Sequence, residues 1–260
     1  MVFFDLLVLG SISGFTIFFG LPLALLKVSA KTRGILNSFA VGILVFLLVD
    51  ILGDAMAEAQ KPILDALSGT GSMGLAAMFF CVLVLGLCTG LLGLVWFETR
   101  YIKGDKTEDD AKAKRLALMI ATGIGLHNFS EGLAIGQSYA GGAITLALTL
   151  VIGFGLHNMT EGFGIAAPLA GRKVSKKYIA LLGLIGGGPT FIGAVLGGFM
   201  VSDIISVLFL SLAGGAVIYV VKELLYHGKI SGEGIPSMAA IIAGFVAGFV
   251  TLVLIHFWVG

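Results

Sequence analysis

The sequence predicts an all-α membrane protein with eight transmembrane helices. Of its 260 residues, 58% are hydrophobic and 12% are charged, whereas a soluble domain carries about 25% charged residues. Apolar runs of about 20 residues recur along the whole chain, and each can cross a bilayer as a helix. We therefore expect one transmembrane domain over residues 1–260. The net charge of +1 gives no indication of a nucleic-acid partner.

The spans follow from the apolar runs taken in order. The first carries Asp5, has no Lys or Arg before it and is too long for the apolar part of a signal peptide, so we expect a retained helix. The longest polar stretch, about 100–115, follows the third span, and its mixed charges predict a mobile cytoplasmic loop. The predicted spans are 4–26, 35–59, 73–99, 115–138, 143–169, 178–200, 204–226 and 236–259.

Small residues in these spans indicate close helix packing. Pairs of glycines four residues apart are typical of membrane helices whose backbones approach closely. Cys81 and Cys88 lie about 10 Å apart along one helix, too far for a disulfide, and we interpret them as packing residues. The glycine pairs are Gly10/Gly14, Gly86/Gly90, Gly193/Gly197 and Gly244/Gly248.

The basic residues predict the orientation of the helices. All but Lys61 of the 16 lysines and arginines lie in or beside the connections that follow the first, third, fifth and seventh spans. Positive residues favour the cytoplasmic side of a membrane. We therefore expect these connections inside the cell and both termini outside.

One polar phrase occurs twice, in the fourth and fifth spans. Residues 123–136 read GIGLHNFSEGLAIG, and residues 153–166 read GFGLHNMTEGFGIA. Ionisable residues inside a membrane are costly, and they mark functional sites by default. Each copy lies near the middle of its span, and consecutive spans are antiparallel. The sequence therefore predicts one site at mid-membrane, built from two matching halves.

The residue types and their spacing favour a transition metal at this site. His127 and Glu131 are four residues apart, as are His157 and Glu161, so each pair lies on one face of its helix. Imidazole with carboxylate suits Zn²⁺, Fe²⁺, Mn²⁺ or Co²⁺ rather than Mg²⁺ or Ca²⁺. No thiolate is present to hold the metal tightly, which suits a site that must release its ion. Asn128 and Asn158 border the same faces.

The paired phrases HNFSEG and HNMTEG resemble the HNxPEG-type signatures of the ZIP family of zinc- and iron-transporting proteins, in its prokaryotic, GufA-like branch. The resemblance covers the whole chain, including the eight spans and the long loop after the third. It implies import of divalent metals such as Zn²⁺, Fe²⁺, Mn²⁺ or Cd²⁺ across the cell (plasma or inner) membrane, and it is compatible with a homodimer. The metal would be the substrate, with no cofactor.

The resemblance also implies residue roles. His127, Glu131, His157 and Glu161 would hold a first metal, and Asn128 and Asn158 would contribute to a second metal bridged by the two glutamates. By the same resemblance, spans 1, 4, 5 and 6 would slide against spans 2, 3, 7 and 8, as in an elevator. No phosphate loop of the GxxxxGK[ST] type is present, so we expect no direct use of ATP.

The sequence departs from the family in two places. Ser130 and Thr160 replace the motif prolines, and we expect a milder bend because their hydroxyls can bond to a backbone carbonyl one turn back. We expect Gly132 and Gly162 to add flexibility. In the sixth span Gly188 stands before Pro189, where the family places a glutamate. We therefore predict one dominant metal site.

Other polar residues predict a path for the ion. Asp50, Asp54 and Glu58 recur every four residues toward the outer end of the second span, and we interpret them as an acidic entrance path. Glu223, near the inner end of the seventh span, could guide exit or form an ordinary interfacial pair with Lys222.

Two enzyme classes are the alternatives. An intramembrane zinc-dependent hydrolase would need an open metal position and a separate acid or base, and no HExxH or GxSxG occurs. Di-iron carboxylate proteins place Glu and His three residues apart rather than four. We expect a transporter and not an enzyme.

Overall fold

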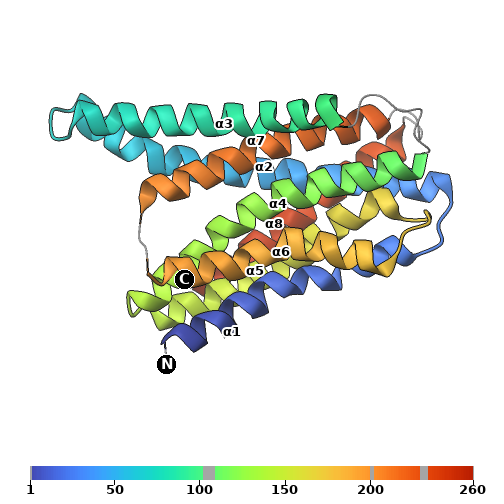
Figure 1. Ribbon diagram of the computed structural model, residues 1–260, viewed down its shortest axis with the longest axis horizontal. Helices are drawn as coiled ribbons and strands as arrows, with labels where there is room; N and C mark the ends of the chain where they lie inside the picture. The colour runs from blue at the N-terminus through green and yellow to red at the C-terminus, as the bar shows by residue number, and fades with distance from the viewer. Residues whose placement is uncertain (1, 102–108, 200–201, 229–233, 260) are drawn as a thin grey trace.

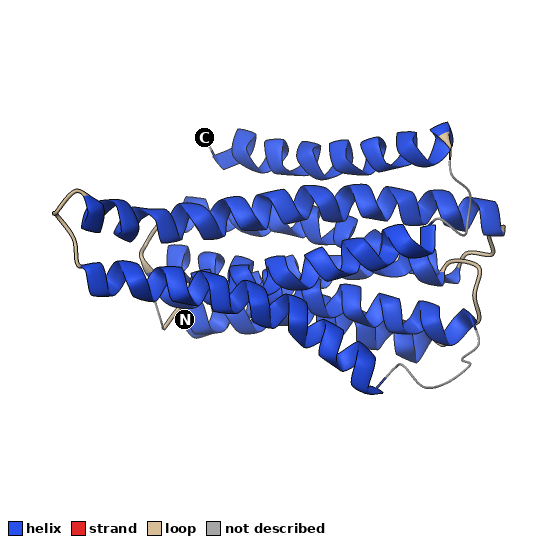
Figure 2. Ribbon diagram, turned by 90° about the horizontal axis from the view of Figure 1, so that it is seen from above, coloured by secondary structure: helices blue, strands red, loops and turns tan. Residues whose placement is uncertain are grey.

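The computed structural model describes residues 2–101, 109–199, 202–228 and 234–259. Within them lie eight α-helices and three short 3-10 helices, as the sequence predicts for an all-α protein (Figures 1 and 2). The α-helices are α1 Val2–Phe15, α2 Ala30–Leu67, α3 Met73–Tyr101, α4 Asp109–Ala140, α5 Ile144–Ala166, α6 Lys176–Gly197, α7 Asp203–Gly228 and α8 Ile235–Val259. The 3-10 helices are η1 Thr16–Phe19, η2 Leu21–Leu25 and η3 Ala167–Leu169.

Seven of the described helices are long and apolar enough to cross a membrane. The exception is α4, which carries the HNFSEG phrase as well as a charged first part at Asp109–Arg115 and is the least apolar of the eight helices. That polar phrase is buried, since α4 packs against α5, α6 and α7 rather than facing outward. The charged loop predicted at about 100–115 is too long, because residues 100–101 belong to α3 and residues 109–115 to α4; the rest of it lies outside the described residues.

The first span is not uniformly α-helical. It extends over Phe3–Leu25, close to the predicted 4–26, but α1 ends at Phe15 and two 3-10 helices complete the crossing. Pro22 lies in the first turn of η2 and has no backbone N–H to continue an α-helical ladder. The second span is longer than predicted, because α2 starts at its Ser29 cap and continues to Leu67. The α2–α3 hairpin projects beyond the other helices at the left of Figure 1.

The helices form two groups that pack on each other. In one group α6 packs against α4 and α1, and α5 packs against α4 and α1. In the other, α7 packs against α3 and α2, and α2 packs against α8. The groups meet mainly where α4 contacts α7 and where α5 contacts α8. These are the two sets, helices 1, 4, 5, 6 and helices 2, 3, 7, 8, that the family resemblance implies.

The predicted glycine pairs lie where helix backbones approach one another. A Cβ atom on Gly14 would collide with the Gly187 carbonyl of α6, and one on Gly90 would collide with the Leu212 carbonyl of α7. Gly193 and Gly244 face the backbones of α4 and α2 in the same way. Their interpretation as packing residues is confirmed.

The helices expose many large apolar side chains, and a polar cluster lies within their apolar interior. Large apolar side chains such as Phe19 (71% exposed) and Phe257 (78%) lie on the outside, as expected for helices in contact with lipid. Cys81 and Cys88 are free and exposed on α3. Their interpretation as packing residues was wrong, because α3 is peripheral and buries few of its residues. The buried polar residues include both His-Asn-x-x-Glu phrases.

Candidate metal centre

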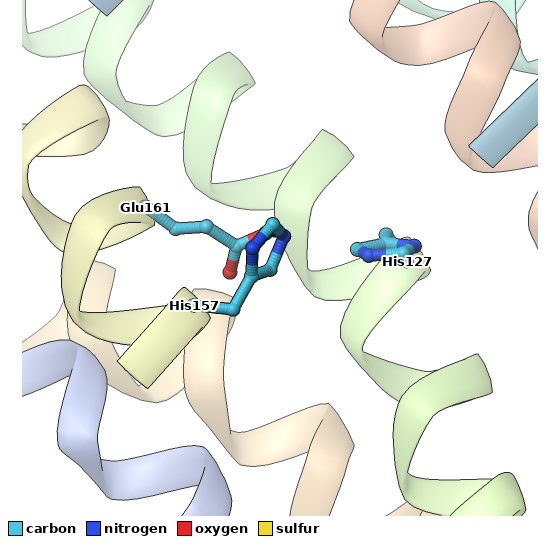
Figure 3. Close-up of side chains that lie close together, drawn as sticks. All are labelled: His127, His157 and Glu161. Carbon is cyan, nitrogen blue, oxygen red and sulfur yellow. Dashed lines mark ion pairs between the residues drawn. The ribbon is translucent and has the colours of Figure 1, made fainter. Parts of the chain in front are cut away.

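The two phrases meet between α4 and α5, as their positions in the sequence predict. His127 of α4 lies opposite His157 and Glu161 of α5 (Figure 3), and ligand atoms of these three side chains lie within 4.8 Å of one another. The two imidazole rings have centroids 6.0 Å apart and are inclined at 71°. A single cation between the helices could therefore contact nitrogen from both histidines and oxygen from Glu161.

Each helix also carries its own His–Glu pair. His127 Nε2 lies 3.4 Å from Glu131 Oε1, and His157 Nε2 lies 3.7 Å from Glu161 Oε1. These spacings result from the four-residue separation, which brings the side chains onto one helix face. Glu131 therefore lies beside the cluster, next to His127.

The site is buried and contains unpartnered polar atoms. His127, Glu131, His157 and Glu161 are at most 5% exposed. Among the described residues, neither nitrogen of His127 has a hydrogen-bond partner, nor do His157 Nε2, Glu131 Oε2 and Glu161 Oε1. Buried polar atoms without partners cost free energy, and each such atom calls for an explanation. A metal bound to these nitrogen and oxygen atoms would provide it.

The two asparagines bind in matching ways. Asn128 Nδ2 donates to Glu161 Oε2 (2.9 Å) across the helix pair and to the Gly186 carbonyl of α6 (3.0 Å). Asn158 Nδ2 donates to the Ser13 carbonyl of α1 (3.0 Å). Each asparagine therefore connects its metal-binding helix to a further helix, and Asn128 also orients Glu161 of the other motif.

Thr251 of α8 is a contact that the sequence did not indicate. Its hydroxyl oxygen lies 3.4 Å from His157 Nδ1, and its hydrogen is donated to the Gly248 carbonyl (2.6 Å). The hydroxyl can then only accept from His157, which places the ring proton on Nδ1 and leaves the Nε2 lone pair facing the cluster. A lone threonine in an apolar helix carries no signal of such a role.

Neither motif interrupts its helix, and the mild bend that the sequence predicts stays a prediction. Both α4 and α5 remain α-helical through Ser130 and Thr160. Thr160 Oγ1 donates to the His157 carbonyl three residues back (2.7 Å), and Ser130 Oγ is buried without a partner among the residues that the structure describes. The hydroxyls therefore leave the helical ladder intact.

The motif glycines lie where helix backbones approach closely, and their expected flexibility stays a prediction. A Cβ atom on Gly132 would collide with the Thr190 carbonyl of α6, and one on Gly162 would collide with the Ile17 carbonyl of η1. Gly132 lets α6 approach the backbone of α4, and Gly162 lets η1 approach the backbone of α5. Gly188 differs, because nothing lies within 4 Å of the place where its Cβ would stand.

The acidic residues of α2 lie on a cavity that reaches the site. This cavity has a volume of about 280 Å³, and Asp50, Asp54, Glu58, His127 and Glu131 all line it. A second cavity of about 390 Å³ lies near the α2–α3 turn and is also lined by Glu58. Glu58 therefore borders both spaces. Glu223 belongs to α7, but its side chain lies outside the described residues.

Comparison with known proteins agrees with this geometry. The family model described as ZIP Zinc transporter matches residues 98–256, which include both motifs and the helices α4 to α7. No curated protein matches the chain.

Proposed function

Because this chain belongs to the ZIP zinc transporter family, we propose that it imports divalent transition-metal ions, with Zn²⁺ as the main substrate and Fe²⁺, Mn²⁺ and Cd²⁺ as further ones. The family consists of transporters, so the chain is not an enzyme, and the hydrolase alternative is excluded. The observation that carries the proposal is the buried cluster of His127, His157 and Glu161. It offers a transition metal two nitrogens and a carboxylate at the meeting point of two membrane-spanning segments.

The proposed ligands of the transported ion are His127, Glu131, His157 and Glu161. Their unpartnered buried atoms support this assignment. Asn128 and Asn158 donate Nδ2 hydrogens to carbonyls of other helices, and their Oδ1 atoms, buried without a partner among the described residues, are the atoms that each would offer to a second metal. A second metal would need the carboxylate that Gly188 lacks. We therefore propose one dominant site.

The proposed entrance is the pair of cavities that share Glu58. Asp54 and Asp50 lie between Glu58 and the metal cluster on the wall of the inner cavity. Carboxylates along a narrow passage raise the local concentration of cations. An ion would move along α2 from Glu58 to Asp50 and then to His127. Glu223 remains a proposed exit residue on the opposite side.

The proposed mechanism is alternating access by sliding of the first helix group (α1, α4, α5 and α6) against the second. The separate packing of the two groups supports it. We propose that the basic loops face the cytoplasm and both termini face outward, in the plasma or inner membrane of a cell. An inside-negative potential then favours import by about 4.6 kcal/mol per divalent cation per 100 mV. We also propose a homodimeric member of the GufA-like branch, with residues 1–260 as one transmembrane domain.

Reconstitution into liposomes tests the function. Radioactive Zn²⁺ should accumulate in vesicles that hold the purified protein, and competing Fe²⁺, Mn²⁺ or Cd²⁺ should reduce that uptake. His127→Ala and Glu161→Ala should each lower uptake at least tenfold. Ser11→Ala is the matched control, because this serine of α1 only donates to the Leu7 carbonyl within its own helix. Uptake unchanged by both site variants would refute the site, and no uptake by the unmodified protein would refute the function.

A further inference from the structure

A third cavity lies at the end of the bundle where the basic residues gather. It has a volume of about 790 Å³ and is far from the two acidic cavities along the helices. Three segments form its wall: the end of η2 with Lys27, the first turns of α4 at Lys114, and the loop that precedes α6. The lining residues are Ala24, Leu25, Leu26, Lys27, Lys114, Gly171, Arg172, Lys173, Val174 and Ser175.

The wall is strongly cationic. Lys27, Lys114, Arg172 and Lys173 all line the cavity. Arg172 Nη1 donates to Asp110 Oδ1 at 3.1 Å, and this hydrogen bond holds the pKa of Asp110 below its usual range. The three lysines form no ion pair with the residues that the structure describes. The cavity therefore keeps an excess of positive charge.

The cavity is held together by hydrogen bonds between its walls. Gly171 N–H donates to the Leu26 carbonyl (2.8 Å), and its φ of +74° favours glycine at this turn. Tyr178 of α6 donates its hydroxyl to the Lys114 carbonyl of α4 (2.7 Å). The wall is thus a defined part of the fold.

Arg172 points to an anionic ligand. Its Nε–H is buried and has no hydrogen-bond partner in the described part of the chain, although its Nη1 is satisfied by Asp110. Guanidinium and ammonium groups that converge on one space are the usual partners of phosphate oxygens. Leu25 and Leu26 are 48% and 53% exposed beside the same space. Lysine and arginine side chains next to exposed leucines suit a lipid, whose phosphate group carries acyl chains.

We propose that this cavity binds the phosphate group of a ligand with net negative charge. An anionic phospholipid of the adjoining leaflet is the source that the exposed leucines favour, and free phosphate is the other source. Basic pockets between membrane helices bind such headgroups. The ligand would connect the end of η2, the first turns of α4 and the loop before α6. Of these, α4 carries half of the metal centre, and η2 packs on α5, which carries the other half. This site does not depend on the proposed transport.

Native mass spectrometry of the delipidated full-length protein tests the proposal. The probes are phosphatidylglycerol, zwitterionic phosphatidylcholine and inorganic phosphate. The variant K27A/K173A removes two exposed charges from the wall and should weaken phosphatidylglycerol binding at least fivefold. The matched control K176A/K177A removes two exposed charges beside the cavity that do not line it, and should bind as the unmodified protein does.

The probes also separate the two sources of phosphate. Binding of phosphatidylglycerol alone that K27A/K173A weakens identifies a lipid site, and the same loss with inorganic phosphate identifies a site for the free anion. Equal binding of phosphatidylcholine would overturn the proposal. So would equal losses in K27A/K173A and K176A/K177A, because the effect would then reflect surface charge in general. Absence of binding by every probe would overturn it as well.

Discussion

Thr251 Oγ1 accepts a hydrogen bond from His157 Nδ1 across the boundary between the two helix groups, at 3.4 Å. The threonine belongs to α8 and the histidine to α5, so a residue outside the metal-binding pair fixes the tautomer of one of its histidines. The contact also joins a helix of the proposed moving group to a helix of the proposed fixed group.

Thr251→Val should weaken metal binding while leaving the fold intact, because valine has the same shape and no hydroxyl. His157 would then lose the acceptor that keeps its proton on Nδ1. Loss of such a supporting contact typically costs 10- to 100-fold in metal affinity. Titration of Zn²⁺ into the purified protein by calorimetry measures the effect. Thr251→Ser keeps the hydroxyl and should retain most of the affinity; equal losses in both variants would contradict the proposed role.

Gly132→Ala should destabilise the protein, because the new methyl group would meet the Thr190 carbonyl of α6. Overpacking of this kind costs about 1–3 kcal/mol. The thermal unfolding midpoint in detergent should fall by several degrees. Gly53→Ala in α2 is the matched control, since nothing lies within 4 Å of its Cβ position and alanine favours a helix. A midpoint for Gly132→Ala at or above that of Gly53→Ala would show that α4 and α6 can separate at little cost.

Gly188→Glu should add a second metal to the site. The substitution places a carboxylate where the ZIP signature of α6 has one, and the space at this position is open. A carboxylate oxygen is a ligand that transition metals accept beside histidine. The number of Zn²⁺ ions bound per chain, measured after dialysis by elemental analysis, should rise from one to two. Gly188→Gln should leave it at one, and two ions in the unmodified protein would refute the single-site proposal.

The sequence predicted the fold and the main cluster well, because both depend on periodic patterns. Apolar runs give the eight helices, and a four-residue spacing puts His127 with Glu131 and His157 with Glu161 on single faces. The 3-10 helices after α1 were not predicted, since Pro22 alone does not reveal how η1 and η2 pack on α5.

Contacts to the backbone were beyond prediction. Asn128 binds the Gly186 carbonyl and Asn158 binds the Ser13 carbonyl, and any residue at either acceptor position offers the same oxygen. The role of Thr251 was missed for a related reason, because its position opposite His157 depends on how α8 packs against α5. Such relationships arise only once the helices are assembled.

The two asparagine amides have a consequence for how an ion leaves. Asn128 joins α4 to α5 through Glu161 and to α6 through the Gly186 carbonyl, and Asn158 joins α5 to α1, so these four helices cannot separate without breaking buried hydrogen bonds. If these helices move as one body past α8, a bound ion keeps the same four ligands throughout. The His157–Thr251 contact would not survive that movement, so the affinity for the ion would differ between the two positions.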